Sequence, residues 1–259
     1  MKQEERRKFL IEELLRERLS CRRQEIPADT DRQKVLLRSL MNVRHPGAIS
    51  QRFLEVQDAY LQGELAAKKI TRLSELSPLQ NGIYLWRGDI TTLDCGAIVN
   101  AANSGMTGCY QPCHNCIDNC IHTYAGVQLR LKCAEIMERQ GFEEPTGQAK
   151  ITPAYNLPCD YVIHTVGPIV QGKLTRQHCK LLESCYRSCL TLADENQVSS
   201  IAFCCISTGV FMFPNDKAAE IAVRTVQEYK AETGSKIEVI FNVFKEQDER
   251  IYSKLLRAD

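Results

Sequence analysis

The sequence predicts an α/β fold with a mixed, mostly buried central sheet, preceded by an N-terminal helical extension. Residues 1–77 have the apolar spacing of helices and lack strand signals. From residue 80 onward, short β-rich runs alternate with longer helical runs, which is typical of helices layered on a sheet. Leu76, Ser77 and Pro78 interrupt the helical pattern. We therefore place a boundary between an extension, residues 1–77, and a second domain, residues 78–259.

Two segments of the extension carry an apolar stripe at helical spacing. They cover residues 8–19 and 50–69, and Pro46 and Gly47 lie between them. An apolar stripe has to be buried against another surface. We therefore expect the extension to pack mainly on the domain that follows it.

The second domain contains alternating candidate strands and helices. The candidate strands cover residues 83–86, 97–100, 147–151, 161–166, 200–206 and 236–241. The candidate helices cover residues 117–139, 176–195 and 215–233. The second helix is expected to end near Asn196, and Asn215 with Asp216 is a possible cap for the third.

Composition excludes several classes of protein. The 259 residues include 33 basic and 32 acidic side chains, for a net charge of +1, which gives no support for nucleic acid or an anionic membrane as a partner. The first 24 residues are charged throughout and lack the apolar core of a signal peptide. No apolar run approaches the ~20 residues of a membrane span. A cytoplasmic protein is expected.

Thirteen cysteines are an unusually large number for such a chain. The number is odd, and a chain of this length can build a core without disulfides, so a disulfide framework is not expected. Several cysteines lie within apolar or helical patterns and are interpreted as small buried hydrophobic residues. These are Cys133, Cys185, Cys189, Cys204 and Cys205.

The remaining cysteines include a cluster that indicates a metal site. Residues 109–116 hold Cys109, Cys113, His114 and Cys116, four soft ligands within eight positions. A closed structural site would use all four side chains. The spacing Cys-x3-Cys-x2-Cys also matches the iron–sulfur motif of radical-SAM enzymes, and a redox-sensing thiol cluster is a further alternative.

Three other motifs carry groups suited to a nucleotide. Asp89, in the turn Gly-Asp-Ile-Thr, either caps the next element or accepts a hydrogen bond from an exocyclic amine such as that of adenine. Asn100 and Asn103, separated by two alanines, offer donors and acceptors for ribose hydroxyls. The loop Ser207-Thr208-Gly209 precedes a predicted helix and presents backbone N–H groups suited to phosphate.

The order of these motifs, together with Ile-His-Thr-Val-Gly-Pro at residues 163–168, resembles the macrodomain family. That resemblance implies a three-layer α/β/α fold that binds ADP-ribose. It implies that Asp89 and Ile90 contact adenine, and that Asn100 and Asn103 lie near the distal ribose. It also implies a diphosphate cradle, with Phe211 near the distal ribose. The cradle residues are Ser207, Thr208, Gly209, Val210 and Phe211.

The segment after Asn103 departs from most of that family. Hydrolytic macrodomains usually have a glycine-rich loop here, whereas this chain has Cys-x4-His-x-Cys. The motif, with the helical extension, resembles the zinc-dependent microbial branch. The resemblance implies that Cys109, His114 and Cys116 bind Zn²⁺, with Cys113 and Cys120 outside the motif. Three protein ligands leave a fourth position open for chemistry.

The resemblance implies a hydrolase that removes mono-ADP-ribose from protein side chains. Asp118 would position or deprotonate the attacking water, although its place near a helix start also suits a capping role alone. Asn103 would hold the ribose. His122, one helical turn after Asp118, and His164, in a buried strand, are interpreted as structural.

The resemblance also suggests partners and leaves two other functions open. The implied substrate is a lipoyl-carrier protein modified by an operon-linked sirtuin-type transferase. One alternative is a reader that binds ADP-ribose without cleaving it and uses zinc structurally. The other is a deacetylase of O-acetyl-ADP-ribose that uses the same pocket.

Overall fold

The structure is a computed structural model that describes residues 1–18 and 25–257. Leu19 of the first expected helix and the last two residues of the second domain lie outside the described residues. At the centre is a six-stranded sheet with strand order β2-β8-β7-β4-β6-β5. The strands are β2 (Ile83–Arg87), β4 (Ala97–Ala102), β5 (Ala149–Pro153), β6 (Tyr161–Val166), β7 (Ser200–Phe203) and β8 (Glu238–Val243).

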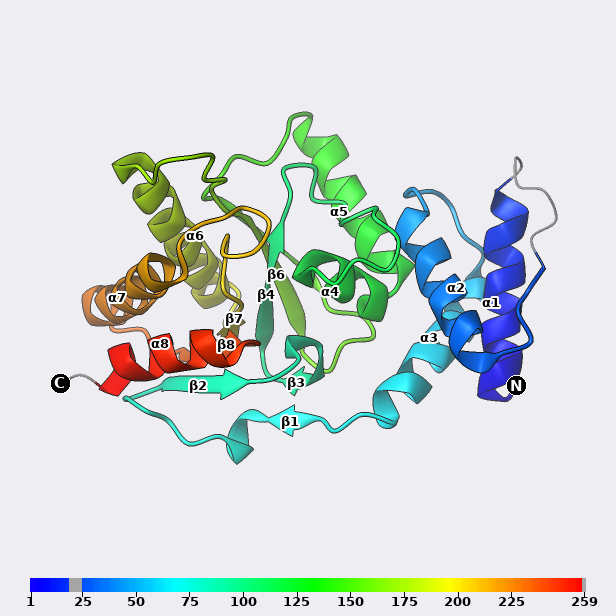
Figure 1. Cartoon of the computed structure of the whole chain (residues 1–259), viewed down its shortest axis with the longest axis horizontal. Coiled ribbons are helices and arrows are strands. Elements are labelled where there is room, and N and C mark those ends of the chain that lie inside the picture. The colour runs from blue at the N-terminus through cyan, green and yellow to red at the C-terminus, as the bar shows by residue number, and fades with distance from the viewer. Residues whose placement is uncertain (19–24, 258–259) are drawn as a thin grey trace.

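The sheet is mixed because β5 pairs antiparallel with β6, while the other neighbouring strands pair in parallel. Helices α4 (Ile117–Ala125) and α5 (Val127–Gln140) lie on one side of it (Figure 1). Helices α6 (Arg176–Glu195), α7 (Asn215–Thr233) and α8 (Glu246–Arg257) lie on the other side. The predicted α/β/α layers are confirmed.

Burial on both faces explains the apolar sequence of the central strands. Val99, Ile163, Ile201 and Ile240 are fully buried, one from each of four neighbouring parallel strands. Parallel strands also end at the same edge of a sheet. The three nucleotide motifs of the sequence lie at or just after the carboxyl ends of β2, β4 and β7, so the fold brings them to one edge.

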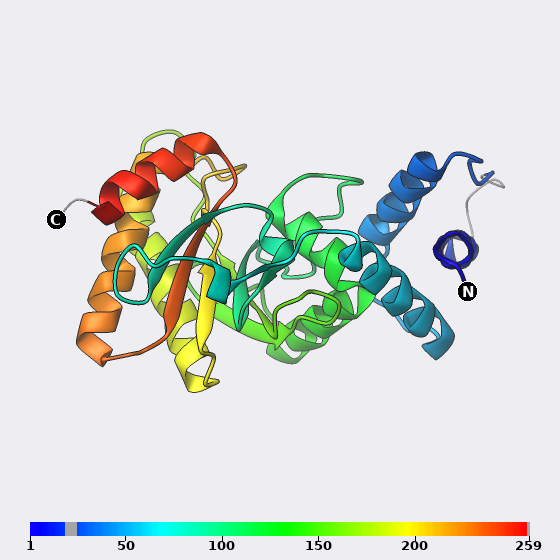
Figure 2. The ribbon, with the colours of Figure 1, turned by 90° about the horizontal axis from the view of Figure 1, so that it is seen from below.

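The N-terminal extension forms its own apolar cluster. Helices α1 (Gln3–Glu17), α2 (Thr30–Val43) and α3 (Gln51–Ala66) pack together beside α4 and α5 (Figure 2). Val127 of α5 joins this cluster, so the extension packs directly against the layer of helices that leads into the site. Asp29 and Ser50 cap α2 and α3 by accepting hydrogen bonds from backbone N–H groups in the first turn.

The extension is not wholly helical, which corrects one expectation. Strand β1 (Thr71–Arg72) pairs in parallel with β3 (Leu93–Asp94), and the short 3₁₀ helices Leu73–Glu75 and Ile90–Thr92 lie beside them. Two residues are too few to give a period-two pattern in the sequence. This small ladder joins the extension to the segment after β2.

Other boundaries also differ from expectation. The helix expected over residues 117–139 is interrupted at Gly126, whose φ of +97° favours glycine and separates α4 from α5. Helix α8 was not foreseen. The strands expected at 147–151 and 236–241 lie two residues further along the chain, and β7 ends at Phe203 rather than at 206.

The ends of the two long helices agree better with expectation. The helices over residues 176–195 and 215–233 are confirmed at both ends. Pro214 occupies the N-cap position of α7, and Asn215 instead donates a hydrogen bond to Asp248 of α8. Among the described residues, no helix is both long enough and apolar enough to cross a membrane.

Candidate metal centre and nucleotide site

Residues 107–116, here called the metal loop, lie between β4 and α4 and gather three potential ligands. Cys109 Sγ, a ring nitrogen of His114 and Cys116 Sγ lie within 4.8 Å of one another, and all three residues are half-buried. Cys109 Sγ is 3.6 Å from His114 Nδ1. A tetrahedral ion with Zn–S of about 2.3 Å and Zn–N of about 2.0–2.1 Å separates sulfur from nitrogen by about 3.6 Å. The donor set and its spacing therefore fit zinc.

Cys113 is directed away from this group. Its backbone has a left-handed φ of +53°, and its N–H donates to Asn42 Oδ1 at 2.8 Å. Its Sγ lies 3.5 Å from the carbonyl oxygen of Val35 in α2. The thiol thus contacts the extension, and the three-ligand arrangement does not include it.

Cys116 also begins α4. As the N-cap residue, its Sγ accepts a hydrogen bond from Asn119 N at 3.4 Å. Burial raises the pKa of this thiol to about 12, the Asn119 N–H opposes that rise, and the neighbouring Cys109 thiol adds to it. A bound cation would favour the thiolate form of Cys116, which is the form that ligates a metal.

A second group, His122, Cys133 and His164, also has ligand atoms within 4.8 Å of one another. It is fully buried, and His164 uses both of its ring nitrogens in hydrogen bonds. Asn100 donates to His164 Nδ1 at 3.1 Å, so Nε2 carries the proton and donates to Thr152 Oγ1 at 3.0 Å. The half-buried group in the metal loop is therefore the better candidate for a metal site, because an ion can reach it and its ligand atoms have free lone pairs.

Asp118 lies two residues after the last of the three ligands and is buried in the first turn of α4. Asn100 Nδ2 donates to its Oδ1 at 2.8 Å, and Asn103 Nδ2 approaches its Oδ2 at 3.3 Å. Burial raises the pKa of Asp118 to about 6, and the bonds from the two asparagines together with the charge of Arg130 oppose that rise. Both carboxylate oxygens are thus held by the two asparagines of the Asn-Ala-Ala-Asn motif.

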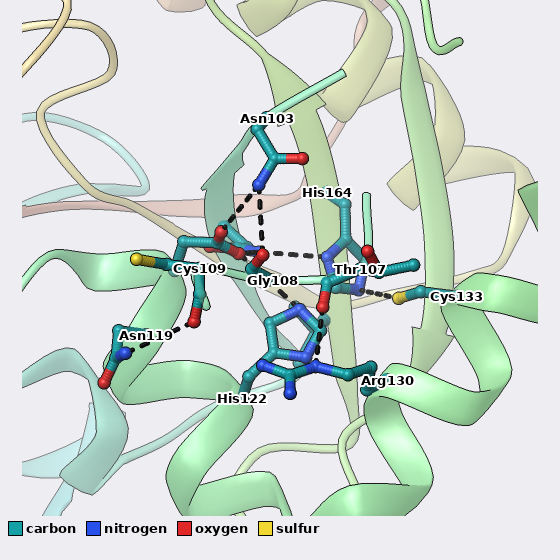
Figure 3. Close-up of polar contacts among 12 residues, drawn as sticks. Asn103, Thr107, Gly108, Cys109, Asn119, His122, Arg130, Cys133 and His164 are labelled. Atoms are coloured by element: carbon teal, nitrogen blue, oxygen red, sulfur yellow. Dashed lines mark hydrogen bonds and ion pairs between the residues drawn. The ribbon is translucent and has the colours of Figure 1, made fainter. Parts of the chain in front are cut away.

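Asn103 links the carboxylate to the metal loop. Its Nδ2 also donates to the carbonyl oxygen of Gly108 at 3.2 Å, as Figure 3 shows, and its Oδ1 accepts from Gly105 N. Gly108 has a φ of +87°, and a Cβ there would lie 2.8 Å from the ring of His122. Only glycine lets the loop pass this close to α4.

The two histidines behind Asp118 are buried and neutral. Burial lowers the pKa of His164 to about 3. Burial is also the main cause that lowers the pKa of His122 well below its usual value, with smaller contributions from the neighbouring His164 and Arg130. His122 Nε2 is 3.5 Å from Asp118 Oδ1, and neither of its ring nitrogens has a hydrogen-bond partner within residues 1–18 and 25–257. Asn100 is fully buried, and its side-chain amide contacts both Asp118 and His164.

Asp89, in the segment after β2, caps the 3₁₀ helix Ile90–Thr92, and its carboxylate remains partly exposed to solvent. Its Oδ1 accepts from Thr91 N at 3.0 Å and from Thr91 Oγ1 at 2.6 Å, while Oδ2 lies 3.6 Å from Lys68 Nζ. The side chain is 44% exposed, and Ile90 beside it is buried. Lys68 also lies over the ring of Tyr124, at 3.8 Å from the centroid. No sequence pattern indicates this lysine, because it is one of several charges near the end of an amphipathic helix.

The loop after β7 presents donors to solvent. The N–H groups of Gly209, Val210 and Phe211 donate to no other group in the described part of the chain, while Val170 N donates to the carbonyl oxygen of Phe211. Ser207 is buried with a φ of +65°, Thr208 donates its hydroxyl to Cys205 O, and Val210 is 73% exposed. Three consecutive free N–H groups form a site suited to an anion.

The expectation about the remaining cysteines is largely confirmed. Every cysteine that the structure describes is a free thiol, and four of the five expected in the core are buried. Cys205 is the exception and is half-buried.

The comparisons with known proteins agree with this fold. The family model described as Macro domain matches residues 99–222. A Treponema medium protein named protein-ADP-ribose hydrolase is 63% identical over 260 residues, covering 99% of this chain and 100% of that relative. A protein of the same name from Staphylococcus aureus (strain MSSA476) is 49% identical over 256 residues, covering 98% of this chain and 96% of that one.

A solved structure agrees as well. The Trypanosoma brucei macrodomain in complex with ADP-ribose superposes with a TM-score of 0.66 at 30% identity, over 84% of this chain and 94% of that one. An α/β/α fold with nucleotide motifs at one sheet edge defines a class of nucleotide-binding domains. The chain belongs to the macrodomain family.

Proposed function

We propose that this macrodomain hydrolyses the bond between mono-ADP-ribose and a modified protein side chain, with Zn²⁺ held by Cys109, His114 and Cys116. The observation that carries the proposal is the position of Asp118. Its carboxylate is buried and held by two asparagines, two residues from the last of three metal-type ligands. The name of the Treponema medium relative, which matches over its full length, supports the same reaction.

We place ADP-ribose along the sheet edge where β2, β4 and β7 end. The half-exposed Asp89 carboxylate, next to buried Ile90, suits the exocyclic amine of adenine. The free N–H groups of residues 209–211, after Ser207 and Thr208, suit the diphosphate. The distal ribose then reaches Asn103, which lies at the surface beside Asp118.

In this arrangement Asp118 orients a water molecule and takes its proton as the water oxygen attacks the anomeric carbon. The bond from that carbon to the acceptor side chain breaks, and the leaving side chain takes up the proton that Asp118 accepted. The products are free ADP-ribose and the unmodified protein. Asn100 and Asn103 keep both carboxylate oxygens oriented by donating to them. When bound, Zn²⁺ would supply a Lewis acid at the open fourth position of its three protein ligands.

The proposal is tested by measuring release of ADP-ribose from a mono-ADP-ribosylated protein, with zinc-loaded and chelator-treated enzyme. A lipoyl-carrier protein modified by a sirtuin-type transferase is the first substrate, because the family resemblance implies that pair. Zinc-dependent release that is lost in Asp118→Ala supports the proposal. Binding of ADP-ribose without release, by either form, would identify a reader instead. O-acetyl-ADP-ribose, assayed in parallel, reports the deacetylase activity.

A further inference from the structure

We propose that helix α2 of the N-terminal extension is a working part of the metal centre. Its residues Arg38 and Asn42 act as positioning residues that hold the metal loop in the conformation that gathers the three ligands. This inference deepens the proposed function and rests on its assignment of those ligands. It gives the extension a role at the site in addition to its own apolar packing.

Arg38 reaches the metal loop and α4 at the same time. Its Nη2 donates to the backbone carbonyl of His114 at 2.8 Å and to Asn119 Oδ1 at 3.1 Å, and it lies 3.7 Å from Cys120 Sγ. His114 is one of the three ligands, so a charged donor from the extension fixes the peptide that carries it. Hydrogen bonds from a charged donor are about twice as strong as neutral ones.

Asn42, one helical turn after Arg38, fixes the neighbouring residue of the loop. It is buried, and its Oδ1 accepts from Cys113 N while its Nδ2 donates to Thr123 Oγ1 of α4 at 2.9 Å. Cys113 has a left-handed backbone, which is unfavourable for a residue with a side chain and needs support from its surroundings. The bond to Asn42 gives that support, and it keeps the Cys113 thiol away from the other ligands.

Arg130 of α5 connects the end of α2 to the start of the metal loop. Its Nη1 donates to the backbone carbonyls of Met41, Asn42 and Arg44 at the end of α2, at 3.1, 2.8 and 2.6 Å. Its Nε donates to the carbonyl of Thr107 at the start of the metal loop at 2.7 Å (Figure 3). These acceptors include the unpaired carbonyls of a helix C-terminus, where a cation is favoured.

Aromatic stacking adds a further contact. The guanidinium of Arg130 lies 4.3 Å from the centroid of the Tyr110 ring, and His45 of the extension stacks on that ring at 5.1 Å. Tyr110 directly follows Cys109, the first ligand. Contacts from the extension thus reach residues 110, 113 and 114 of the loop.

These contacts bear on metal affinity because the loop has no regular structure of its own. Ordering such a segment around an ion costs conformational entropy, and a segment already held in place has less to lose. Groups that orient metal ligands typically change metal affinity by about 10- to 100-fold when they are removed. We therefore expect Arg38 and Asn42 to raise the affinity for zinc without touching the ion.

The test compares Arg38→Ala and Asn42→Ala with Arg32→Ala, whose exposed arginine lies on the same helix. Hydrogen exchange over residues 107–120 is measured on the metal-free full-length chain. Zinc affinity is measured by competition with a chromophoric chelator, and overall stability by thermal unfolding. In Arg38→Ala and Asn42→Ala, the Cys113 amide should exchange at least about tenfold faster and zinc should bind about 10- to 100-fold more weakly. Arg38→Lys, which keeps a charged donor, should fall between Arg38→Ala and the unmodified chain.

The outcomes separate this inference from the proposed function. Exchange and zinc affinity that stay unchanged in Arg38→Ala and Asn42→Ala overturn the inference. A variant that unfolds at lower temperature but keeps the exchange of the loop and the zinc affinity also overturns it, because it shows a purely structural role. If the unmodified chain binds no zinc, the metal assignment of the proposed function fails. The exchange data on metal-free protein still decide whether α2 holds the loop.

Discussion

The side-chain amide of Asn100 donates to both Asp118 Oδ1, at 2.8 Å, and Nδ1 of His164, at 3.1 Å. Asp118 as a carboxylate only accepts, so the amide nitrogen has to face it, and the neutral ring of His164 accepts the second bond. The orientation of Asp118 is therefore fixed from inside the sheet by a residue that is itself fully buried.

Replacing Asn100 by leucine should reduce catalysis more than binding. Hydrogen bonds to a charged group contribute about 1.5–3 kcal/mol, so kcat should fall by roughly tenfold to a hundredfold while KM changes little. Steady-state kinetics on a mono-ADP-ribosylated protein measure both. Thr152→Val, which removes only the outer partner of His164, is the matched control and should have a smaller effect. A raised KM with unchanged kcat would instead indicate that Asn100 contacts the ribose directly.

Asp118→Asn should retain ADP-ribose and lose turnover. The variant preserves the shape of the side chain but cannot take a proton from water, and general bases contribute about 10²- to 10⁴-fold to rate. Calorimetric titration with ADP-ribose should give an affinity close to that of the unmodified protein. Turnover within tenfold of the original would remove Asp118 from the mechanism and leave it a capping role.

The three-ligand set predicts unequal effects of two cysteines that are three residues apart. Cys116→Ala should lower zinc to well below one per chain and abolish turnover, because it removes both a ligand and the cap of α4. Cys113→Ala should keep zinc near one per chain, because that thiol contacts Val35 instead. Elemental analysis after dialysis measures the metal, and chelator should abolish turnover in the unmodified protein. Loss of zinc in Cys113→Ala would indicate a closed four-ligand site.

The lowered pKa of His164 leads to a prediction of how the free energy of unfolding depends on pH. Its folded pKa of about 3 lies below the ordinary value of 6.5, because burial disfavours the charged ring. Between these two values the unfolded chain binds a proton that the folded chain does not, so stability falls as pH decreases below 6.5. The slope for one such group approaches about 1.4 kcal/mol per pH unit.

Urea unfolding of metal-free protein at pH 7.5, 6 and 5 measures this slope, with chelator present throughout. His164→Asn should give a shallower decrease over the same range, because the titrating ring is gone. Equal slopes for the two proteins would show that His164 accepts a proton in the fold. Above pH 7 the prediction is that this group contributes no pH dependence.

Local patterns predict the elements whose sequence signals are complete. The helices over residues 176–195 and 215–233 have complete apolar stripes and clear polar ends, and both were predicted at their boundaries. The break at Gly126 could not be predicted, because a single glycine is tolerated within helices. A Cβ on Gly126 would lie 2.6 Å from the side chains of both Gln128 and the distant Gln57 of the extension, so the space at this position depends partly on tertiary packing.

The candidate site also contains some residues that local sequence patterns predict and others that they do not. Cys109, His114 and Cys116 lie close together in space largely because they lie close together in sequence. Cys113 is equally close in sequence, and only its left-handed backbone and its bond to Asn42 separate it from the others. Arg38 and Asn42 look like ordinary polar positions of an amphipathic helix, so no pattern in α2 indicates their partners 76 and 71 residues away.

The metal loop combines contacts of two very different ranges along the chain. Cys109 and Cys116 are only seven positions apart, whereas the contacts of the loop with α2 join residues more than seventy positions apart. Closing a short segment costs less chain entropy than closing a long one. If these residues hold the proposed metal, a partly unfolded chain would already have its three ligands close together before the contacts with α2 form. Under the proposed zinc assignment, docking of the extension would then tighten the site, and zinc loading would be coupled to the packing of the extension.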